Sequence, residues 1–497
     1  MTREEFQNLI GRATDLLRRD GLGVIEYIEE IAWLLFLKSL DALEENRRVE
    51  AELAGRTYAP ILEEDYRWGR WAKGDLTGAA LMDFVNAKLF PYLQRLQGNA
   101  ERERIRTVFQ ALGRPHTRSG YTLKDVIQVI DRIDFFNAED VYALSMVYEE
   151  LLKEMGNAAG LAGEFYTPRH LVRFMVEMAE PTSEDTVYDP GMGTGGFLVS
   201  AFEWMRERYG EGLSGEGYRA LQRRFSGREK KPLTYLLGLM NLLLHGLTEA
   251  DVHVGNTLTI NVLDPSLPRH SLILTNPPFG GKEHKSVQQN FPYPTAATEA
   301  LFLQHILRSL APGGRAAVIL PEGMLFRGGV IEEIRKELLE RNRVRAVISL
   351  PPGVFEPYAG VKTNIIYIEK SRPDENTTEV VWFFDVQADG FSLTKSRRSI
   401  PENDLPETLR LWREWVKPQK EGWQEAATSE KSWTATLDQI REEGYNLTAA
   451  HYNPNPKEQL EHEPPAVLLR RLKAQHEATL DSIGDLMELV EPEGEAK

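Results

Sequence analysis

The sequence contains no cysteine among its 497 residues. Disulfide bonds, thiolate zinc sites and cysteine nucleophiles are therefore excluded. Long apolar segments are also lacking, because the longest uninterrupted run covers only residues 31–37, whereas a membrane-spanning helix needs roughly 20 apolar residues. The first residues, MTREEFQNLI, do not resemble a signal peptide. We expect a cytoplasmic protein that makes no membrane contact, and we predict no metal site.

The sequence has fewer basic than acidic residues. The chain has 59 lysine and arginine residues against 75 aspartate and glutamate residues, which gives a formal net charge of −16. Contacts to phosphates supply most non-specific affinity for nucleic acids, so strong unaided binding to DNA is not expected. One local basic patch is available within residues 223–231. No Walker A pattern occurs, which argues against a nucleotide-driven motor.

The N-terminal third has the periodicity of helices. Apolar residues recur at steps of three and four from Phe6 to Leu17, a second helix is predicted within residues 25–45, and others around 123–133 and 139–155. We interpret residues 1–155 as a helical N-terminal domain.

From about residue 163, short β-branched runs alternate with helical stretches. This alternation predicts parallel strands joined by helices, hence an α/β, doubly wound, Rossmann-like domain over residues 156–455. Strands are expected at 186–189, 272–275, 316–320, 346–350, 364–368 and 380–384, and helices at 195–208, 233–245, 298–310 and 329–340. Residues 456–497 are predicted to form a C-terminal helical tail whose apolar stripe consists of Leu469, Leu472, Leu480, Ile483, Met487 and Val490.

A glycine-rich segment, VYDPGMGTGGFL at 187–198, follows the first predicted strand of this domain. Its glycines allow a ligand to approach the backbone closely, and its G-x-G-x-x-G spacing also fits a dinucleotide site. Asp189 favours a different ligand, because a carboxylate at the loop repels a pyrophosphate but suits an ammonium group. S-adenosylmethionine has an ammonium group, a ribose diol and no phosphate. Glu229 is a candidate for the diol, although its charged neighbours, taken alone, favour a solvated surface residue.

A second loop, NPPF at 276–279, follows the predicted strand at 272–275. Two prolines make the loop stiff and remove two amide donors, so that carbonyl acceptors remain. The Asn276 side-chain oxygen and the Pro277 carbonyl could accept both N–H bonds of an aromatic amine, and Phe279 could stack on its ring. Alone, the tetrapeptide equally suits a rigid turn with a core phenylalanine. Together with the glycine loop it favours methyl transfer to an amine.

These motifs carry a resemblance to a known family. DPGMGTGGF followed by NPPF resembles the amino-methyltransferases, and GEFYTPRHLV at 163–172 resembles their additional cofactor-binding motif. This order is similar to the γ arrangement of DNA N6-adenine methyltransferases. Further segments resemble the modification (M) subunit of type I restriction–modification systems, and the resemblance extends from about residue 5 to 455. They lie at 25–45, 227–246, 310–326, 350–355 and 363–370.

The resemblance implies roles for individual residues. The catalytic loop would consist of Asn276, Pro277, Pro278 and Phe279. The residues that hold S-adenosylmethionine would be Glu164, Phe165, Tyr166, Thr167, Pro168, Arg169, Asp189, Gly191, Gly193, Thr194, Gly195, Gly196, Glu229 and Asn256. Two positions depart from the family pattern, since Gly191-Met192 replaces smaller residues and Asn256 stands where an aspartate is usual.

The resemblance also implies partners. They are double-stranded DNA with its target adenine flipped out, a specificity (S) subunit that binds two copies of this chain, and a restriction (R) subunit in the full complex. The helical domains would close around the DNA, and the C-terminal helix would pack on the specificity subunit. The alternatives are a methyltransferase for RNA bases or protein glutamine, and an inactive scaffold subunit.

Overall fold

The structure is a computed structural model. It describes residues 2–53, 55–137, 141, 144–151, 167–356, 360–372, 375, 377–394, 397–454, 469, 470, 473 and 476. Residues Met1–Tyr452 form one compact unit and Asn453–Lys497 a second one. In the second unit the described residues 469, 470, 473 and 476 are helical, whereas Leu472, Leu480, Ile483, Met487 and Val490 of the predicted stripe lie outside the described residues. No described helix is long and apolar enough to cross a bilayer.

The N-terminal region is helical, as its periodicity predicts. Helix α1 (Arg3–Arg19) starts at a capping box, in which the Thr2 hydroxyl accepts the Glu5 amide at 3.2 Å and the Glu5 carboxylate accepts the Thr2 amide at 2.7 Å. Helix α2 (Val24–Leu53) is buried on most sides through its middle, which explains why apolar residues occur on more than one face of this helix. The other helices are α3 (Trp68–Trp71), α4 (Gly78–Phe84), α5 (Phe90–Leu93), α6 (Ala100–Leu112) and α7 (Gly120–Ile130), and residues 144–151 are helical too.

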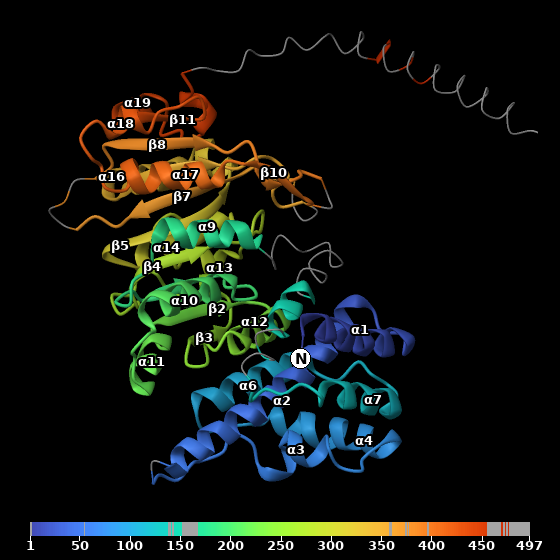
Figure 1. The fold of residues 1–497 in the computed structure, drawn as a ribbon. Helices are drawn as coiled ribbons and strands as arrows, with labels where there is room; N and C mark the ends of the chain where they lie inside the picture. Colours follow the sequence, from blue (N-terminus) through green and yellow to red (C-terminus); the bar gives the residue numbers. More distant parts are fainter. Residues whose placement is uncertain are drawn as a thin grey trace, which may run out of the picture. The chain divides into compact units, whose positions relative to one another are not determined.

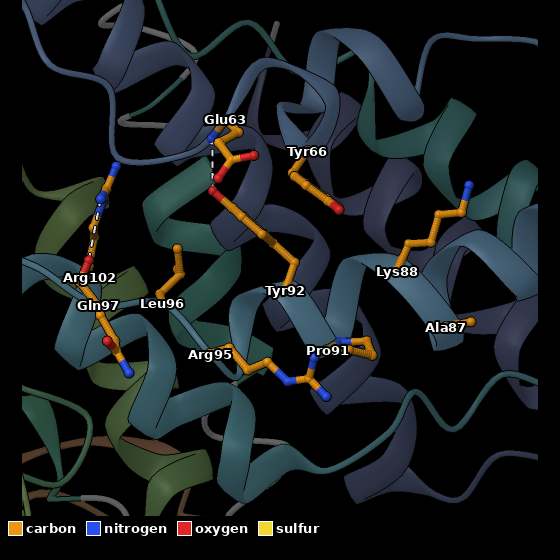
Figure 2. Close-up of a pocket in the computed structure, with 10 residues that line it drawn as sticks. All are labelled: Glu63, Tyr66, Ala87, Lys88, Pro91, Tyr92, Arg95, Leu96, Gln97 and Arg102. Atoms are coloured by element: carbon orange, nitrogen blue, oxygen red, sulfur yellow. Dashed lines mark hydrogen bonds between the residues drawn. The ribbon is translucent and has the colours of Figure 1, made fainter.

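A π-helical turn, η2 (Val85–Leu89), interrupts the helix between α4 and α5. Pro91 lacks an amide hydrogen and clashes with the carbonyl four residues earlier, so it disturbs the hydrogen-bond ladder at this point. Beside the turn lies a cavity of about 460 Å³ (Figure 2). Its wall includes Tyr66 and Tyr92, whose rings stack with centroids 3.8 Å apart. None of the predicted site residues lines this cavity.

A nine-stranded sheet forms the centre of the second region, in the order β11-β8-β6-β7-β5-β4-β1-β2-β3. Its strands are β1 (Val187–Asp189), β2 (Phe225–Glu229), β3 (Asp251–Val254), β4 (His270–Thr275), β5 (Leu310–Pro321), β6 (Arg343–Ser349), β7 (Thr363–Glu369), β8 (Val380–Asp385) and β11 (Ser432–Thr436). A separate hairpin pairs β9 (Asp389–Phe391) with β10 (Ser399–Asn403).

The predicted α/β class is confirmed, but the expectation of parallel strands throughout is wrong. Strand β7 runs antiparallel to both neighbours, β5 and β6, and β11 runs antiparallel to β8. A parallel connection normally needs a crossover helix. The described residues between β6 and β7 contain turns and no helix, so the chain returns beside β6 in the opposite direction.

Helices cover both faces of the sheet (Figure 1). Successive residues of β4 point to opposite faces, so Leu272 and Leu274 join one apolar core and Ile273 joins another. The first core includes residues of α9 (Arg169–Ala179), α10 (Gly196–Tyr209), α12 (Pro232–Leu244) and α17 (Leu405–Leu411). The second includes residues of α14 (Thr298–Ser309), α15 (Gly323–Phe326), α16 (Val330–Arg341), α19 (Leu437–Glu442) and η6 (Ala449–Tyr452). The shorter elements are η1 (Glu64–Tyr66), α11 (Gly215–Gln222), η4 (Thr257–Thr259), α13 (Lys285–Gln288), η5 (Trp412–Val416) and α18 (Trp423–Ala426).

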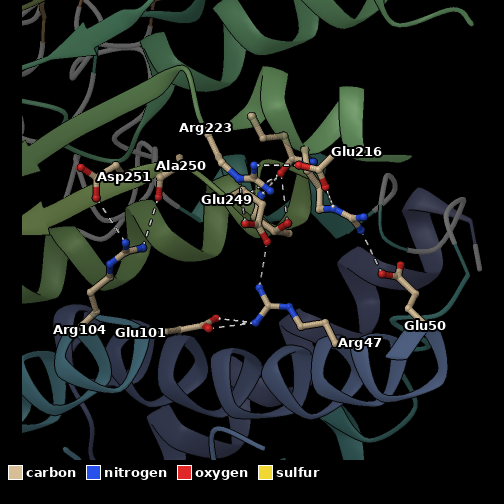
Figure 3. Close-up of polar contacts among 12 residues, drawn as sticks. Arg47, Glu50, Glu101, Arg104, Glu216, Arg223, Glu249, Ala250 and Asp251 are labelled. Carbon is tan, nitrogen blue, oxygen red and sulfur yellow. Dashed lines mark hydrogen bonds and ion pairs between the residues drawn. The ribbon is translucent and has the colours of Figure 1, made fainter. Parts of the chain in front are cut away.

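Ion pairs join the N-terminal helices to the neighbourhood of β3 (Figure 3). Arg47 lies 2.9 Å from Glu101 and 3.4 Å from Glu249, and Arg104 donates to the Ala250 carbonyl at 3.3 Å. Beneath these pairs, α2 and α6 pack on α12 through apolar side chains. Partly exposed ion pairs stabilise a fold by about 0–1 kcal/mol each, so the apolar packing dominates this contact.

One charged pair holds three strands together at the amino edge of the sheet. Arg315 of β5 donates two hydrogen bonds to the Asp185 carboxylate, both at 2.9 Å. Asp185 precedes β1 and also accepts the Ser271 hydroxyl of β4 at 2.7 Å. Burial alone would raise the pKa of Asp185, but the Arg315 guanidinium outweighs it and lowers this pKa to about 2.

Asp185→Asn should therefore lower the free energy of unfolding at pH 7 by about 2 kcal/mol, since one pKa unit corresponds to about 1.4 kcal/mol. Because its pKa is lowered, the ionised carboxylate stabilises the protein fully at any pH above the ordinary pKa of 3.8. This stabilisation is lost as the pH falls towards 2. Urea unfolding of both proteins at pH 7 and below pH 4 measures the difference. Equal stabilities at pH 7 would contradict the assigned role.

Candidate active site at the carboxyl edge of the sheet

The two predicted loops leave the sheet side by side. Strands β1 and β4 are parallel neighbours, with Val187 opposite Leu272 and Tyr188 opposite Ile273. The glycine loop and the NPPF loop therefore both start at the carboxyl edge, which is where α/β folds bind ligands. Because neighbouring strands are about 4.8 Å apart, groups on the two loops can act on one ligand or on two ligands in contact.

The glycine loop makes a tight turn between β1 and α10. Gly193 and Gly195 have positive φ angles of 53° and 75°, a conformation that side chains disfavour. Met192, one of the two departures from the family pattern, is buried and packs over Gly227 of β2, where an added Cβ would lie 2.9 Å from its sulfur. Its side chain thus belongs to the core, and the loop presents its backbone to the carboxyl edge.

Two buried carboxylates accept hydrogen bonds from this loop. The Gly191 amide donates to Asp189 at 3.1 Å, and the Gly193 amide donates to Glu229 at 3.1 Å. Glu229 also accepts the Lys231 amide at 2.7 Å and is only 9% exposed, so its interpretation as a solvated surface residue is wrong. Burial raises the pKa of Asp189 to about 7, and burial also raises the pKa of Glu229.

The NPPF loop presents a buried acceptor that receives no hydrogen bond from the residues that the structure describes. The Asn276 side-chain nitrogen donates to the Thr167 hydroxyl at 3.1 Å, which orients the carboxamide. Its oxygen is buried and accepts no hydrogen bond within the described structure. A buried carbonyl oxygen without a donor costs about 1–3 kcal/mol. A ligand with an N–H group would recover this free energy at the position where the sequence predicts an amine.

Phe279 meets a second aromatic residue that sequence reasoning did not assign to the site. Its ring lies edge-to-face against Phe355, with centroids 5.9 Å apart and planes at 88°. Phe355 is buried in the loop after β6. The available signal was the segment LPPGVF, which has the same double proline and phenylalanine after a predicted strand as NPPF.

The structure describes only part of the upstream motif. Glu164, Phe165 and Tyr166 lie outside the described residues, whereas Thr167 and Pro168 precede α9. Thr167 contacts Asn276, a link between the two motifs that their separation in sequence conceals.

Arg169 lies between two helices. It pairs with Glu149 at 2.9 Å, and its guanidinium covers the start of α10 so closely that a Cβ on Gly196 would overlap it. The contact of Arg169 with a cofactor stays a prediction.

The remaining predicted residues surround the glycine loop. Thr194 is buried, and its carbonyl accepts the Asn241 side chain at 2.8 Å. Asn256 follows β3, where the adjacent Gly255 amide donates to the Glu229 carbonyl at 2.7 Å. The Asn256 oxygen caps η4 by accepting the Leu258 amide at 3.0 Å. Asn256 is therefore close to Glu229, but its oxygen already has a donor.

The fold and the paired loops define a methyltransferase, and comparisons with known proteins give the family. The N-6 DNA Methylase family model matches residues 139–461, and the HsdM N-terminal domain model matches residues 6–130. The chain is 35% identical over 495 residues to the type I restriction enzyme EcoEI methylase subunit of Escherichia coli, covering 97% of this chain and 96% of the relative. It is 30% identical over 408 residues to the EcoKI methylase subunit of E. coli K12, covering 78% of this chain and 72% of the relative.

Solved structures agree. A chain from a structural study of type I restriction–modification complex assembly is 42% identical, with a TM-score of 0.82 and 100% coverage of both chains. A type I modification subunit from Vibrio vulnificus YJ016 is 35% identical, with a TM-score of 0.77 and coverage of 93% and 99%. The chain belongs to the N6-adenine DNA methyltransferase family, among the methylase subunits of type I restriction enzymes.

The raised pKa of Asp189 predicts a pH dependence of cofactor binding. If Asp189 faces the ammonium group of S-adenosylmethionine, only its ionised form attracts that group, and the affinity should fall about tenfold for each pH unit below 7 and level off above it. Calorimetric titration between pH 5.5 and 8.5 measures this change. The variant Asp189→Asn should bind weakly and lose the pH dependence, and an unchanged profile in this variant would contradict the assignment.

Proposed function

We propose that the chain holds S-adenosylmethionine at the glycine loop and methylates N6 of an adenine flipped out of double-stranded DNA. The observation that carries this proposal is the buried oxygen of Asn276, which has no hydrogen-bond donor among the described residues, beside a loop with two buried carboxylates. An amine acceptor fits the first feature and a cationic donor fits the second. An inactive scaffold would have no use for either feature.

The donor side suits S-adenosylmethionine better than a dinucleotide. Asp189 would face the ammonium group, at a position where its carboxylate would repel a pyrophosphate, and Glu229 would face the ribose hydroxyls. Gly191, Gly193, Thr194, Gly195 and Gly196 would hold the amino-acid end through backbone groups. When bound, S-adenosylmethionine supplies an electrophilic methyl group on a sulfonium.

The acceptor side explains how a poor nucleophile can react. The lone pair of an adenine amino group is delocalised into the ring. The Asn276 oxygen and the Pro277 carbonyl would accept its two N–H bonds, favour a pyramidal nitrogen and offset the positive charge that grows during the attack. Phe279 would stack on the base, an interaction typically worth about 1–3 kcal/mol, with Phe355 supporting its ring. The base must leave the duplex to reach this loop.

The partners belong to the proposal as well. The acidic chain is poorly suited to bind DNA alone, so we propose a separate specificity subunit that binds two copies of it in the cytoplasm, joined by a restriction subunit in the full complex. The proposed domains are 1–155, 156–455 and 456–497, the last packing on the specificity subunit.

Replacing Asn276 with alanine should reduce the single-turnover methylation rate at least about 100-fold, the usual effect of removing a group that stabilises transition-state charge. Cofactor affinity should stay within about twofold, because Asp189 and Glu229 are untouched. Thr167→Val should lower the rate by a smaller factor, since it removes only the partner that orients the Asn276 amide, and Thr167→Ser should restore it. Labelled cofactor and the assembled enzyme provide the assay. An Asn276→Ala enzyme that keeps most of its rate would refute the catalytic role.

Deleting residues 465–497 should weaken binding to the specificity subunit at least about tenfold and leave cofactor affinity unchanged. Sedimentation analysis of the mixed subunits measures the first quantity and calorimetry the second. Sequence-specific methylation by the purified chain alone would contradict the proposed dependence on a partner.

A further inference from the structure

The turn after β5 exposes an aromatic side chain for which the methyl-transfer site has no use. Strand β5 is the neighbour of β4, so this turn leaves the carboxyl edge next to the NPPF loop. Within the turn, Met324 and Leu325 of α15 are buried, whereas Phe326 is 53% exposed. A large exposed aromatic ring beside a ligand site is a candidate for contact with a partner.

An adjoining segment adds to this apolar surface. The Glu322 amide donates to the Lys362 carbonyl at 2.9 Å, and the Lys362 side chain lies 3.0 Å from the Glu322 carboxylate. These contacts bind the turn to residues 360–362, just before β7. Val361 in that segment is 46% exposed. Phe326 and Val361 thus belong to two connected segments at the same edge.

A buried arginine fixes the turn that carries Phe326. Arg335 of α16 is 1% exposed, and its guanidinium donates to the carbonyls of Met324 at 3.1 Å and Arg327 at 2.7 Å. The same guanidinium donates to the Tyr445 carbonyl at 2.8 Å. Burying a guanidinium against backbone carbonyls is expensive. These hydrogen bonds fix the conformation of the turn and thereby the position of Phe326.

The adjacent methyl-transfer site indicates which partner Phe326 contacts. An adenine flipped into the NPPF loop leaves a gap in the base stack of the duplex, and this gap must pass close to the same edge. Proteins that distort DNA insert apolar side chains between base steps to offset the lost stacking. The exposed Arg327 directly follows Phe326 and can meet a phosphate, which is notable in a chain with a net charge of −16.

We propose that Phe326 enters the base stack of the DNA where the target adenine leaves it, and so stabilises the flipped-out state. Val361 borders the same gap, and Arg327 contacts the backbone. Phe326 is a positioning residue, since it touches neither the methyl group nor the target amine. This inference rests on the proposed flipping of adenine and adds the residue that takes the place of the base.

The test compares two duplexes in the enzyme assembled with its specificity subunit. In one the target adenine is paired with thymine, and in the other it faces an abasic site, so that its base pair is already broken. Phe326→Ala should slow single-turnover methylation of the paired duplex at least about tenfold, because unstacking a base step costs a few kcal/mol. On the abasic duplex its rate should stay within about threefold of the wild type. Phe326→Tyr, which keeps the ring, should resemble the wild type on both.

Tyr209 provides a matched control. It ends α10, a helix that starts at the glycine loop and runs back to the opposite edge of the sheet, and it is 37% exposed. Tyr209→Ala should leave both rates unchanged. With 2-aminopurine at the target position, the fluorescence rise on binding should be large for the wild type and the control and small for Phe326→Ala.

Three results would overturn the inference. They are an unchanged rate of Phe326→Ala on the paired duplex, an equal loss on both duplexes, and a failure of this variant to assemble with the specificity subunit, which would make the surface a protein interface. A wild-type complex that methylates neither duplex would contradict the proposed function itself, and the inference with it.

Discussion

Parallel pairing of β1 with β4 is the constraint on which the site depends. These strands are separated by more than 80 residues, yet Val187 lies opposite Leu272 and Tyr188 opposite Ile273. A shift of one residue would turn every side chain of β4 to the other face and displace the NPPF loop from the glycine loop. At the opposite end of the same strands, Arg315, Asp185 and Ser271 form a charged hydrogen-bond cluster. The charged cluster at the amino edge thus stabilises the strand register that places the two loops side by side at the carboxyl edge.

The site itself contains polar groups that are unfavourable without a ligand. Burial raises the pKa of Asp189 to about 7, and the Asn276 oxygen has no donor within the described part of the chain. A hydrophobic core built only for stability would avoid both. Here the surrounding packing stabilises them, and the proposed ligands supply the missing cation and N–H groups. Arg335 differs, because its buried guanidinium already donates to backbone carbonyls and so fixes the turn that exposes Phe326.

Much of this could be predicted from sequence because the signals are local. The periodicity of α10, α12, α14 and α16 predicts those helices within one or two residues of their observed bounds, and the two loops are recognisable by their glycines and prolines. Strands β2 and β3 escaped prediction because they are short and contain polar residues. The direction of β7 depends on the connection from β6, not on its own residues. The contacts of Thr167 with Asn276 and of Phe279 with Phe355 join distant segments, so only the fold reveals them.

The central claim is that the two loops act together as one site for N6-methylation of DNA adenine. The most direct test incubates the chain, its specificity subunit and duplex DNA with isotopically labelled S-adenosylmethionine, and then identifies the labelled product by mass spectrometry of the digested DNA and of the proteins present. The account predicts label in N6-methyladenine, at a fixed sequence and dependent on Asn276. Label in another base, in RNA or in a protein glutamine, or no transfer at all by the assembled enzyme, would contradict it.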